Sequence, residues 1–264
     1  MRSPRPCLRQ VLAMTEWESS SSGSKKGYAM AVRQYGDKFN SGGLMNLPKD
    51  DPIVVTDGIR SPIGHVAKSL ANLEASDLLS QTVKQLLAKF KINPEVIDHC
   101  VVGWVGQDVR APNIARVTTL KAGLRKEIPG FTVQCNCVSS IEALSSATRL
   151  IMAGEAEVVM TGGVEIMSNF PYAIQGSRAN KNLRSLETVK TKWPELWGAE
   201  GVTISDTTEQ GLSDPVRLIN MAGTAEVCAQ MYDVSRQEQD LYAHESFKRC
   251  VAAEKRGFYA THTY

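Results

Sequence analysis

Apolar residues in the middle of the chain alternate between strand-like runs and helix-like spacing. Runs typical of short buried strands occur at residues 53–56, 100–103, 131–133 and 157–163. Helical spacing of apolar side chains falls between and after them, over residues 77–91, 113–122 and 137–153. This alternation predicts a parallel sheet joined by right-handed crossovers, which is an α/β fold.

Capping residues support the ends of these helices. Ser76 is predicted as the N-cap of the first helix, because a serine hydroxyl can accept a backbone N–H there. Gly123 and Gly154 suit the C-terminal ends of the other two, where a left-handed residue often ends a helix.

Two more helices are predicted near the C-terminus, over residues 225–232 and 236–256. Ser235 and Glu238 have the spacing of a capping box at the start of the longer one, and Gly257 is placed to end it. Between about residue 170 and these helices the apolar periodicity is lost, which predicts an irregular segment.

Composition divides the chain into three parts. Residues 1–50 are rich in serine, glycine and lysine and show little apolar periodicity, so we expect a flexible N-terminal extension. Residues 51–174 form the expected α/β core. Residues 175–264 form an expected irregular, α-rich loop domain that ends in the long helix.

Overall composition narrows the class of protein. With 264 residues, 42% of them hydrophobic, the chain can build one sizeable core, and no apolar run approaches a membrane span. A net charge of +2 argues against nucleic acid as a main partner. The six cysteines lack the dense spacing of a secreted disulfide framework, so we expect reduced thiols.

The first fifteen residues bear on the compartment. Arg2, Arg5 and Arg9, with no acidic residue among them, resemble a mitochondrial presequence. Pro4 and Pro6 break the amphipathic helix that such a signal needs. We therefore expect a cytoplasmic protein, with the mitochondrial matrix as the alternative.

The strongest candidate for chemistry is Cys137, which follows the strand 131–133 and stands at a helix start. The first turn of a helix has unpaired N–H groups and the positive end of the helix dipole, which favour a thiolate and a nearby oxyanion. The carboxyl ends of parallel strands are also where α/β sheets bind ligands. Cys137 is thus a candidate nucleophile for acyl transfer or redox chemistry, the alternative being a small buried apolar residue.

Cys135 and Cys137 together allow another interpretation, a Cys-x-Cys metal or redox pair. A structural zinc site needs four ligands, usually including another close pair of cysteines or histidines, and the sequence offers none. We therefore expect no metal site.

Several separated motifs carry a resemblance to a known family. They lie at residues 57–64, 103–107 with Asn113 and Arg116, 131–137, 162–169, 211–215, 221–226 and 235–240. In order and spacing they resemble the N-terminal half of the thiolases, which cleave 3-ketoacyl-CoA with CoA or condense two acyl-CoA molecules. The resemblance covers roughly residues 52 to 258.

The resemblance implies both a fold and a reaction. The fold would be a mixed, mainly parallel sheet with helices on both faces, followed by the loop domain. Cys137 would form an acyl-enzyme with a CoA thioester, and its backbone N–H would help to hold the oxyanion. CoA would be a substrate contacted at Met221 and Arg217, with no permanently bound cofactor. Glu165, Met167 and Ser168 match the family signature and would be structural.

Basic residues of the loop domain admit two interpretations. Either they bind the CoA phosphates or they belong to a solvated loop, and they are Arg178, Lys181, Arg184, Lys190, Lys192 and Arg217.

Two segments depart from the usual thiolase pattern. The sequence from Cys137 to Ser140 reads Cys-Val-Ser-Ser where the family usually has Cys-Gly-Ser-Gly. This variant is similar to the β-subunit type of fatty-acid oxidation complexes, which tends towards longer acyl chains. Asn220 stands where many thiolases carry a histidine, which puts one CoA contact in doubt.

A complete thiolase site also needs groups from the family's second half, which the resemblance does not reach. These are two histidines, an asparagine-bound water and a second cysteine. The histidines of this chain match none of those motifs, and they are His65, His99, His244 and His262. We therefore expect a homo-oligomer or a complementing subunit that carries the C-terminal half. The alternative is a non-catalytic CoA-binding or assembly subunit.

Overall fold

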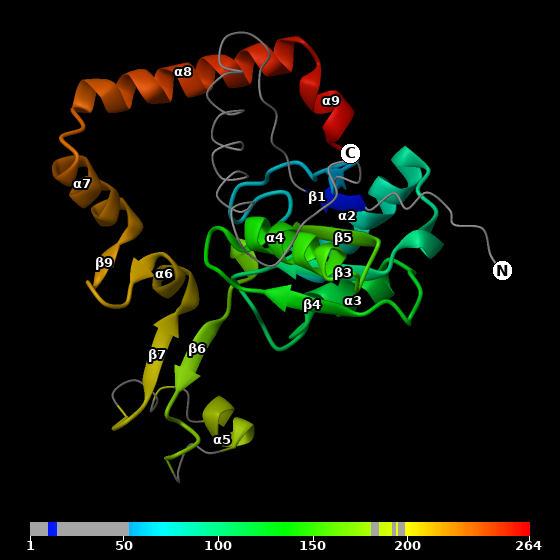
Figure 1. The fold of residues 1–264 in the computed structure, drawn as a ribbon. Coiled ribbons are helices and arrows are strands. Elements are labelled where there is room, and N and C mark those ends of the chain that lie inside the picture. The colour runs from blue at the N-terminus through cyan, green and yellow to red at the C-terminus, as the bar shows by residue number, and fades with distance from the viewer. Residues whose placement is uncertain (1–9, 15–52, 181–184, 192–193, 195–198) are drawn as a thin grey trace.

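The computed structural model describes residues 10–14, 53–180, 185–191, 194 and 199–264 (Figure 1). In this part of the chain a five-stranded sheet has the order β2-β1-β5-β3-β4, and every pairing within it is parallel. Its strands are β1 (Gln10–Met14), β2 (Val54–Val55), β3 (His99–Gly103), β4 (Gly130–Val133) and β5 (Val158–Gly163).

The flexible extension predicted for residues 1–50 is wrong at Gln10–Met14, because this segment is strand β1. It pairs with β5 over its whole length and with β2 at Gln10 and Val11. The rest of residues 1–50 lies outside the described residues. Local composition did not reveal the strand, because its partners lie more than forty residues away in sequence.

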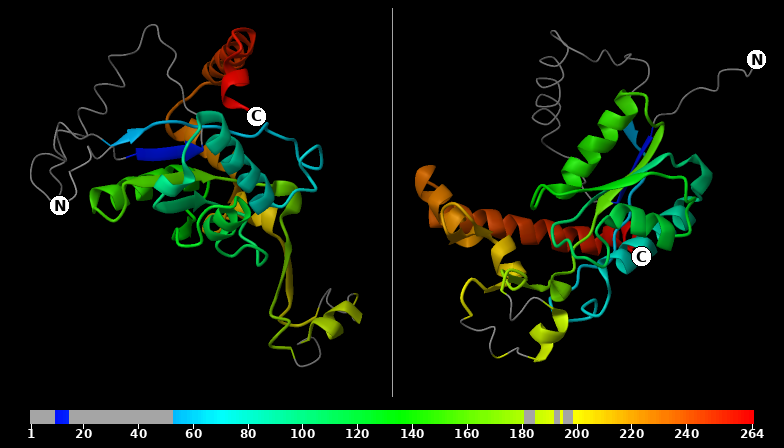
Figure 2. Two further views of the ribbon diagram at one scale, coloured as in Figure 1. Left: turned by 90° about the vertical axis from the view of Figure 1, so that its right-hand side faces the viewer. Right: turned by 90° about the horizontal axis from the view of Figure 1, so that it is seen from below.

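Helices cover both faces of the sheet, which confirms the predicted α/β class (Figures 1 and 2). On one face α2 (Ala75–Phe90) and α3 (Ile114–Lys121) bury Leu86 and Ile114. On the other, α4 (Ser139–Met152) packs on β3 and β5 through Ala143, Ala147 and Ile151. Side chains alternate along a strand, so Cys100 and Val102 of β3 join the first core and Val101 the second.

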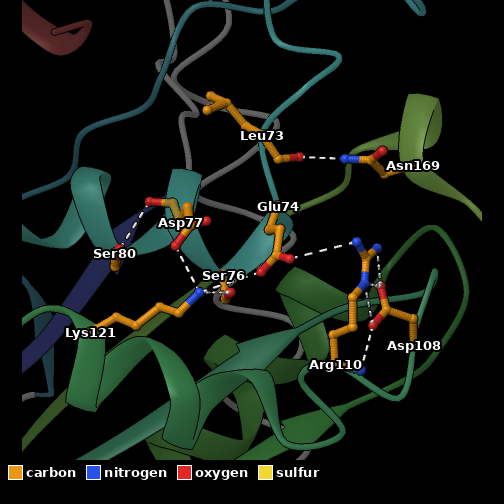
Figure 3. A network of polar contacts seen from close by, with 9 residues as sticks. All are labelled: Leu73, Glu74, Ser76, Asp77, Ser80, Asp108, Arg110, Lys121 and Asn169. Atoms are coloured by element: carbon orange, nitrogen blue, oxygen red, sulfur yellow. Dashed lines mark hydrogen bonds and ion pairs between the residues drawn. The ribbon is translucent and has the colours of Figure 1, made fainter.

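The predicted N-cap Ser76 is wrong, since α2 begins at Ala75 with Glu74 as its N-cap and no capping side chain. Ser76 is buried, and its hydroxyl accepts a hydrogen bond from Lys121 Nζ at 2.8 Å. Lys121 also pairs with Asp77 at 2.7 Å, so this network joins α2 to α3 (Figure 3). The Ser76 hydroxyl therefore serves a contact between α2 and α3 and does not cap α2.

The other capping predictions are confirmed. Gly123 and Gly154 have φ angles of 80° and 75° directly after the C-caps of α3 and α4. The predicted start of the third helix is two residues early, because α4 begins at Ser139 with Val138 as its N-cap.

An antiparallel hairpin leads away from the sheet (Figure 1). It consists of β6 (Tyr172–Gln175) and β7 (Thr203–Asp206), and the chain between them includes α5 (Leu186–Thr191). The short α6 (Thr207–Gly211) follows, capped by the Asp206 carboxylate. A second small sheet pairs β8 (Ser213–Asp214) with β9 (Ile219–Asn220), and two 3-10 turns lie at Pro94–Val96 and Met167–Asn169.

The C-terminal helices confirm the predicted helical segment. Helix α7 (Met221–Met231) starts four residues before the predicted position, because the Asn220 side chain caps it. The capping box of Ser235 and Glu238 opens α8 (Arg236–Lys255), and Gly257 follows its C-cap with φ 73°. Helix α9 (Phe258–His262) then returns the chain to the core. No helix in the described residues is both long and apolar enough to cross a membrane.

Candidate active site

Cys137 lies in a tight turn between the end of β4 and the start of α4, and it is exposed. Asn136 before it has φ 48°, a left-handed conformation that asparagine tolerates better than most residues. The buried Ser139 holds the turn, since its Oγ accepts the Cys135 N–H at 2.9 Å and donates to the Asn136 carbonyl at 2.6 Å. The two hydrogen bonds of Ser139 therefore fix the backbone of the turn that carries Cys137.

Two glycines let the N-terminus of α4 approach the sheet. Gly103 and Gly163 face each other at the carboxyl ends of β3 and β5. A Cβ on Gly103 would lie 2.4 Å from the Ser139 carbonyl carbon, and one on Gly163 would lie 1.9 Å from Ser140 Oγ. A larger residue at Gly103 would push the first turn of α4, and the Cys137 turn with it, away from the sheet, whereas one at Gly163 would collide first with the Ser140 side chain.

A cavity of about 380 Å³ opens at this edge of the sheet, and Cys137 is part of its wall. Gly103, Gly163, Ser139 and Ser140 form the wall beside Cys137. Apolar side chains supply much of the remainder, namely Trp104, Val105, Val164, Met167, Phe170 and Leu212. Cys137 thus borders a space suited to an apolar group.

Glu165 ties together the loops that follow β3 and β5. Its carboxylate accepts the N–H groups of Val105 and Gly106 at 3.1 and 3.0 Å. Burial of the carboxylate raises its pKa, and the hydrogen bonds from these two N–H groups oppose that rise. Although the residue as a whole is exposed towards the cavity, both oxygens have partners, so its observed role is structural, as the sequence predicted.

The loop that carries Glu165 is anchored to the segment that precedes α2. Ser168 Oγ accepts the Ala67 N–H at 2.9 Å. Asn169 Nδ2 donates to the Leu73 carbonyl at 2.6 Å, as Figure 3 shows. Ser168 is thereby structural, whereas Met167 contributes directly to the cavity wall.

Comparison with known proteins identifies the family. Residues 53–262 match the family description "Thiolase, N-terminal domain". The chain belongs to the thiolase family. The recognition made from the motifs is thus confirmed.

Relatives with assigned names agree with this family. The chain is 34% identical over 208 residues to an acetyl-CoA acetyltransferase of Allochromatium vinosum, covering 79% of this chain and 49% of that protein. It is 34% identical over 218 residues to a beta-ketoadipyl-CoA thiolase of Acinetobacter baylyi, covering 78% and 49%. The crystal structure of the Bacillus anthracis acetyl-CoA acetyltransferase matches with a TM-score of 0.66 at 30% identity, covering 77% and 48%. The chain spans about half the length of these thiolases.

The two residues expected to contact CoA do not line the Cys137 cavity. Arg217 lies in the turn between β8 and β9, where its N–H donates to Asp214 Oδ1 at 2.9 Å. Met221 begins α7 and is 41% exposed. Their contact with CoA stays a prediction. Lys181, Arg184 and Lys192, also considered for the CoA phosphates, lie outside the described residues.

None of the four histidines lines the cavity of this thiolase domain. His99 starts β3 and so lies at the opposite edge of the sheet, where burial lowers the pKa of its imidazole and Phe131 meets its ring edge-on. His65 lines a separate cavity of about 290 Å³, and His244 and His262 lie on α8 and α9.

The Cys-x-Cys pair gains no further metal ligands in the described residues. No group of three or more His, Cys, Asp or Glu side chains gathers there in a way that could hold a metal ion. The metal interpretation of Cys135 and Cys137 therefore has no structural support.

Sequence reasoning missed the residues that shape the Cys137 turn and its cavity. Gly103 and Gly163 were noted as parts of motifs, and their common position at strand ends was the signal for a close approach. Ser139 carried no comparable signal, because its two hydrogen bonds depend on the path of the turn. Trp104 and Phe170 gave no signal either, since the cavity joins loops from separate strands.

Proposed function

We propose that this chain supplies the nucleophile of a thiolase-type acyltransferase, with Cys137 as the residue that takes the acyl group from a CoA thioester. One observation carries the proposal: Cys137 is exposed in a fixed turn at the N-terminus of α4, in the wall of an apolar cavity. The family supports the reaction type, because relatives matching this domain are named acetyl-CoA acetyltransferase and beta-ketoadipyl-CoA thiolase.

The proposed step is an acyl transfer between two sulfur atoms. The Cys137 sulfur attacks the thioester carbonyl, a bond forms from Sγ to the acyl carbon, and the bond to the CoA sulfur breaks. The proton of the thiol ends on the departing CoA thiol. The Cys137 N–H and the positive end of the α4 dipole are proposed to stabilise the negative charge that develops on the carbonyl oxygen.

The cavity lining supports an acyl group as the part of the substrate held beside the thiol. Trp104, Phe170 and Leu212 offer apolar contacts and limit access of water to the reacting carbon. Longer acyl chains are the proposed preference, as the Cys-Val-Ser-Ser sequence suggested. CoA itself is proposed to extend towards Met221 and Arg217.

A proton acceptor for Cys137 is proposed to come from outside the described residues. A cysteine nucleophile is normally activated by an adjacent base, and no histidine of the described part of the chain lines the cavity. A complementing polypeptide with the C-terminal half is the proposed source, and the chain is proposed to form a homo-oligomer or to bind such a polypeptide. The proposed compartment is the cytoplasm, with the mitochondrial matrix as the alternative.

The test is peptide mass spectrometry of the purified chain after incubation with acetyl-CoA and with longer acyl-CoAs. Any co-purifying polypeptide is identified in the same run, and a C-terminal half from a related thiolase is added in a parallel reaction. We expect an acyl mass on Cys137 that is lost in Cys137→Ser and kept in the matched exposed-cysteine control Cys228→Ser.

The same experiment can overturn the proposal. If no acyl group appears on Cys137 even with the C-terminal half supplied, the chain is not the nucleophile-bearing part of an acyltransferase. Retained binding of CoA without acylation would then identify a non-catalytic CoA-binding or assembly subunit.

A further inference from the structure

Cys135 is a second exposed thiol beside Cys137 that the proposed acyl transfer does not use. The other described cysteines differ in position. Cys100 is fully buried on β3, and burial raises the pKa of its thiol to about 12, so it is shielded from reagents. Cys228 and Cys250 are exposed but belong to α7 and α8. Among the described thiols, only Cys135 shares a turn with Cys137.

The backbone of this turn brings the two cysteines together. The Val138 N–H donates to the Cys135 carbonyl at 3.3 Å, which closes a four-residue turn around Asn136 and Cys137. Cys135 and Cys137 are also paired as an isolated β-bridge. Disulfides need Cα separations of about 4.4–6.8 Å, and a turn that brings two residues this close along the chain favours such a separation.

Side-chain access is the second requirement, and it is met for both residues. Each is exposed, so a small oxidant can reach either sulfur. Ser139 binds the backbone on both sides of the pair, through the Cys135 N–H and the Asn136 carbonyl, and leaves both sulfurs unengaged by its hydroxyl.

We propose that Cys135 and Cys137 form a thiol-oxidation site that reacts with hydrogen peroxide and closes to a reversible disulfide. In the first step the Cys137 thiolate attacks one peroxide oxygen. A sulfur–oxygen bond forms, the oxygen–oxygen bond breaks, and the departing hydroxide takes a proton to become water. Cys137 is oxidised to a sulfenic acid and the peroxide is reduced.

In the second step the Cys135 thiolate attacks the Cys137 sulfur. The disulfide bond forms, the sulfur–oxygen bond breaks, and a second water leaves. Two thiols and one hydrogen peroxide thus give one disulfide and two waters. The bond would enclose a single intervening residue at an exposed position, which is the kind of disulfide that thiol reductants reopen readily.

The disulfide would have two consequences for the site. It removes the thiol on which the proposed acyl transfer depends, so oxidation would stop acylation of Cys137; this consequence rests on the proposed function. It also protects Cys137 from further oxidation to sulfinic acid, which thiols do not reverse. The disulfide chemistry itself does not require that the chain be an acyltransferase.

The sequence offers a clean readout for this reaction. Trypsin cleaves after Lys126 and Arg149 and releases residues 127–149, which contain Cys135 and Cys137 and no other cysteine. The purified chain is treated with hydrogen peroxide, remaining thiols are blocked with N-ethylmaleimide, and the digest is analysed by mass spectrometry. We expect this peptide to be two hydrogen atoms lighter and unalkylated, and to regain two alkylatable thiols after dithiothreitol.

Matched variants separate the inference from its alternatives. In Cys135→Ser the intrapeptide disulfide cannot form, and Cys137 should accumulate as sulfenic acid trapped by dimedone and then as sulfinic acid. Cys228→Ser should behave as the unchanged chain does. Circular dichroism checks that Cys135→Ser keeps its helical content.

The inference is overturned if peroxide drives Cys137 to sulfinic acid in the unchanged chain while Cys135 is recovered as an alkylated thiol. It is equally overturned if Cys135 is found joined to a cysteine outside residues 127–149. Acylation is measured separately on the reduced chain. If the acyl-transfer proposal fails, the disulfide measurement still decides the present inference.

Discussion

The α/β core and the C-terminal arm, defined as α7 and α8, are stabilised in different ways. In the core, α2 and α4 bury apolar side chains that are almost completely inaccessible, such as Leu86 and Ile151. In α8 only Ala253 is buried, while Leu241, Tyr242 and Phe247 are all more than 60% exposed. Both regions contain regular helices, but the core helices bury many more apolar side chains than α8 does. Figure 2 shows the course of α8 relative to the core.

Local interactions hold α8 together in place of packing. Its capping box and the ion pairs Arg236–Asp240 at 2.9 Å and Arg249–Glu245 at 3.0 Å lie within the helix itself. Such solvent-exposed pairs contribute little to stability. The comparison teaches that regular helix geometry is no measure of stability, which depends on the apolar area removed from water.

The largest expected difference comes from deleting the same side chain in each region. Leu86→Ala should lower the free energy of unfolding by about 2–5 kcal/mol, because it removes a fully buried side chain and leaves a cavity. Leu241→Ala, at 61% exposure, should change it by less than about 0.5 kcal/mol. Urea denaturation followed by circular dichroism measures both. An equal loss in the two variants would show that α8 is buried by a partner in solution.

A smaller effect is expected from adding a methyl group at the cavity. Gly103→Ala places a Cβ against the backbone of Ser139 and Ser140 and should cost about 1–3 kcal/mol, because packed backbone must shift. Gly211→Ala, in the same cavity wall but with no atom within 4 Å of the added Cβ, is the matched control and should be close to neutral. Thermal unfolding and the rate of Cys137 alkylation report the change. Unchanged alkylation in Gly103→Ala would contradict the role of this glycine.

The remaining effects concern two serines, one in each region, and the second of them is the smallest. Ser139→Ala loses two hydrogen bonds in a buried position and should cost about 1–3 kcal/mol, with slower or less selective alkylation of Cys137 that Ser139→Thr partly restores.

Ser235→Ala removes a helix cap and should cost about 1 kcal/mol or less, visible as faster hydrogen exchange in the first turn of α8 only. A cooperative loss of the core in Ser235→Ala would argue against the separation of the two regions.

The strands and helices of the core were predictable because their signals are local. The runs at 100–103 and 131–133 became β3 and β4 within one residue at each end, and helical spacing located α2 and α4 within two residues. Each of these elements is buried on a defined face, so the spacing of apolar residues within the element is enough to predict it.

Elements that depend on distant partners were not predictable in this way. The hairpin of β6 and β7 pairs Gln175 with Thr203, across 27 intervening residues, and has little apolar alternation. Strand β1 likewise depends on β2 and β5. Both form because hydrogen bonds to a remote strand complete them, which no local pattern reveals.

Of the candidate site, only Cys137 and its location at the carboxyl end of the sheet were predictable from the sequence. Cys137 was found from its place between a strand and a helix, and the structure puts it in the cavity wall. The rest of that wall comes from β3, β5 and the α6 segment, whose meeting depends on the fold as a whole. Ser139 acts through two hydrogen bonds within the turn, and Gly103 acts by leaving room for the backbone of Ser139 and Ser140. Neither effect can be read from spacing along the chain.

The paired glycines Gly103 and Gly163 also imply an order of events when the chain folds. The Cys137 turn cannot take its final path until β3 and β5 are side by side and α4 has settled on them. These contacts join residues sixty positions apart, and pairing of distant parallel strands is slow compared with helix formation. We therefore expect the Cys137 turn to be among the last parts of the core to be assembled, so that a chain with only its helices formed would still lack the candidate site.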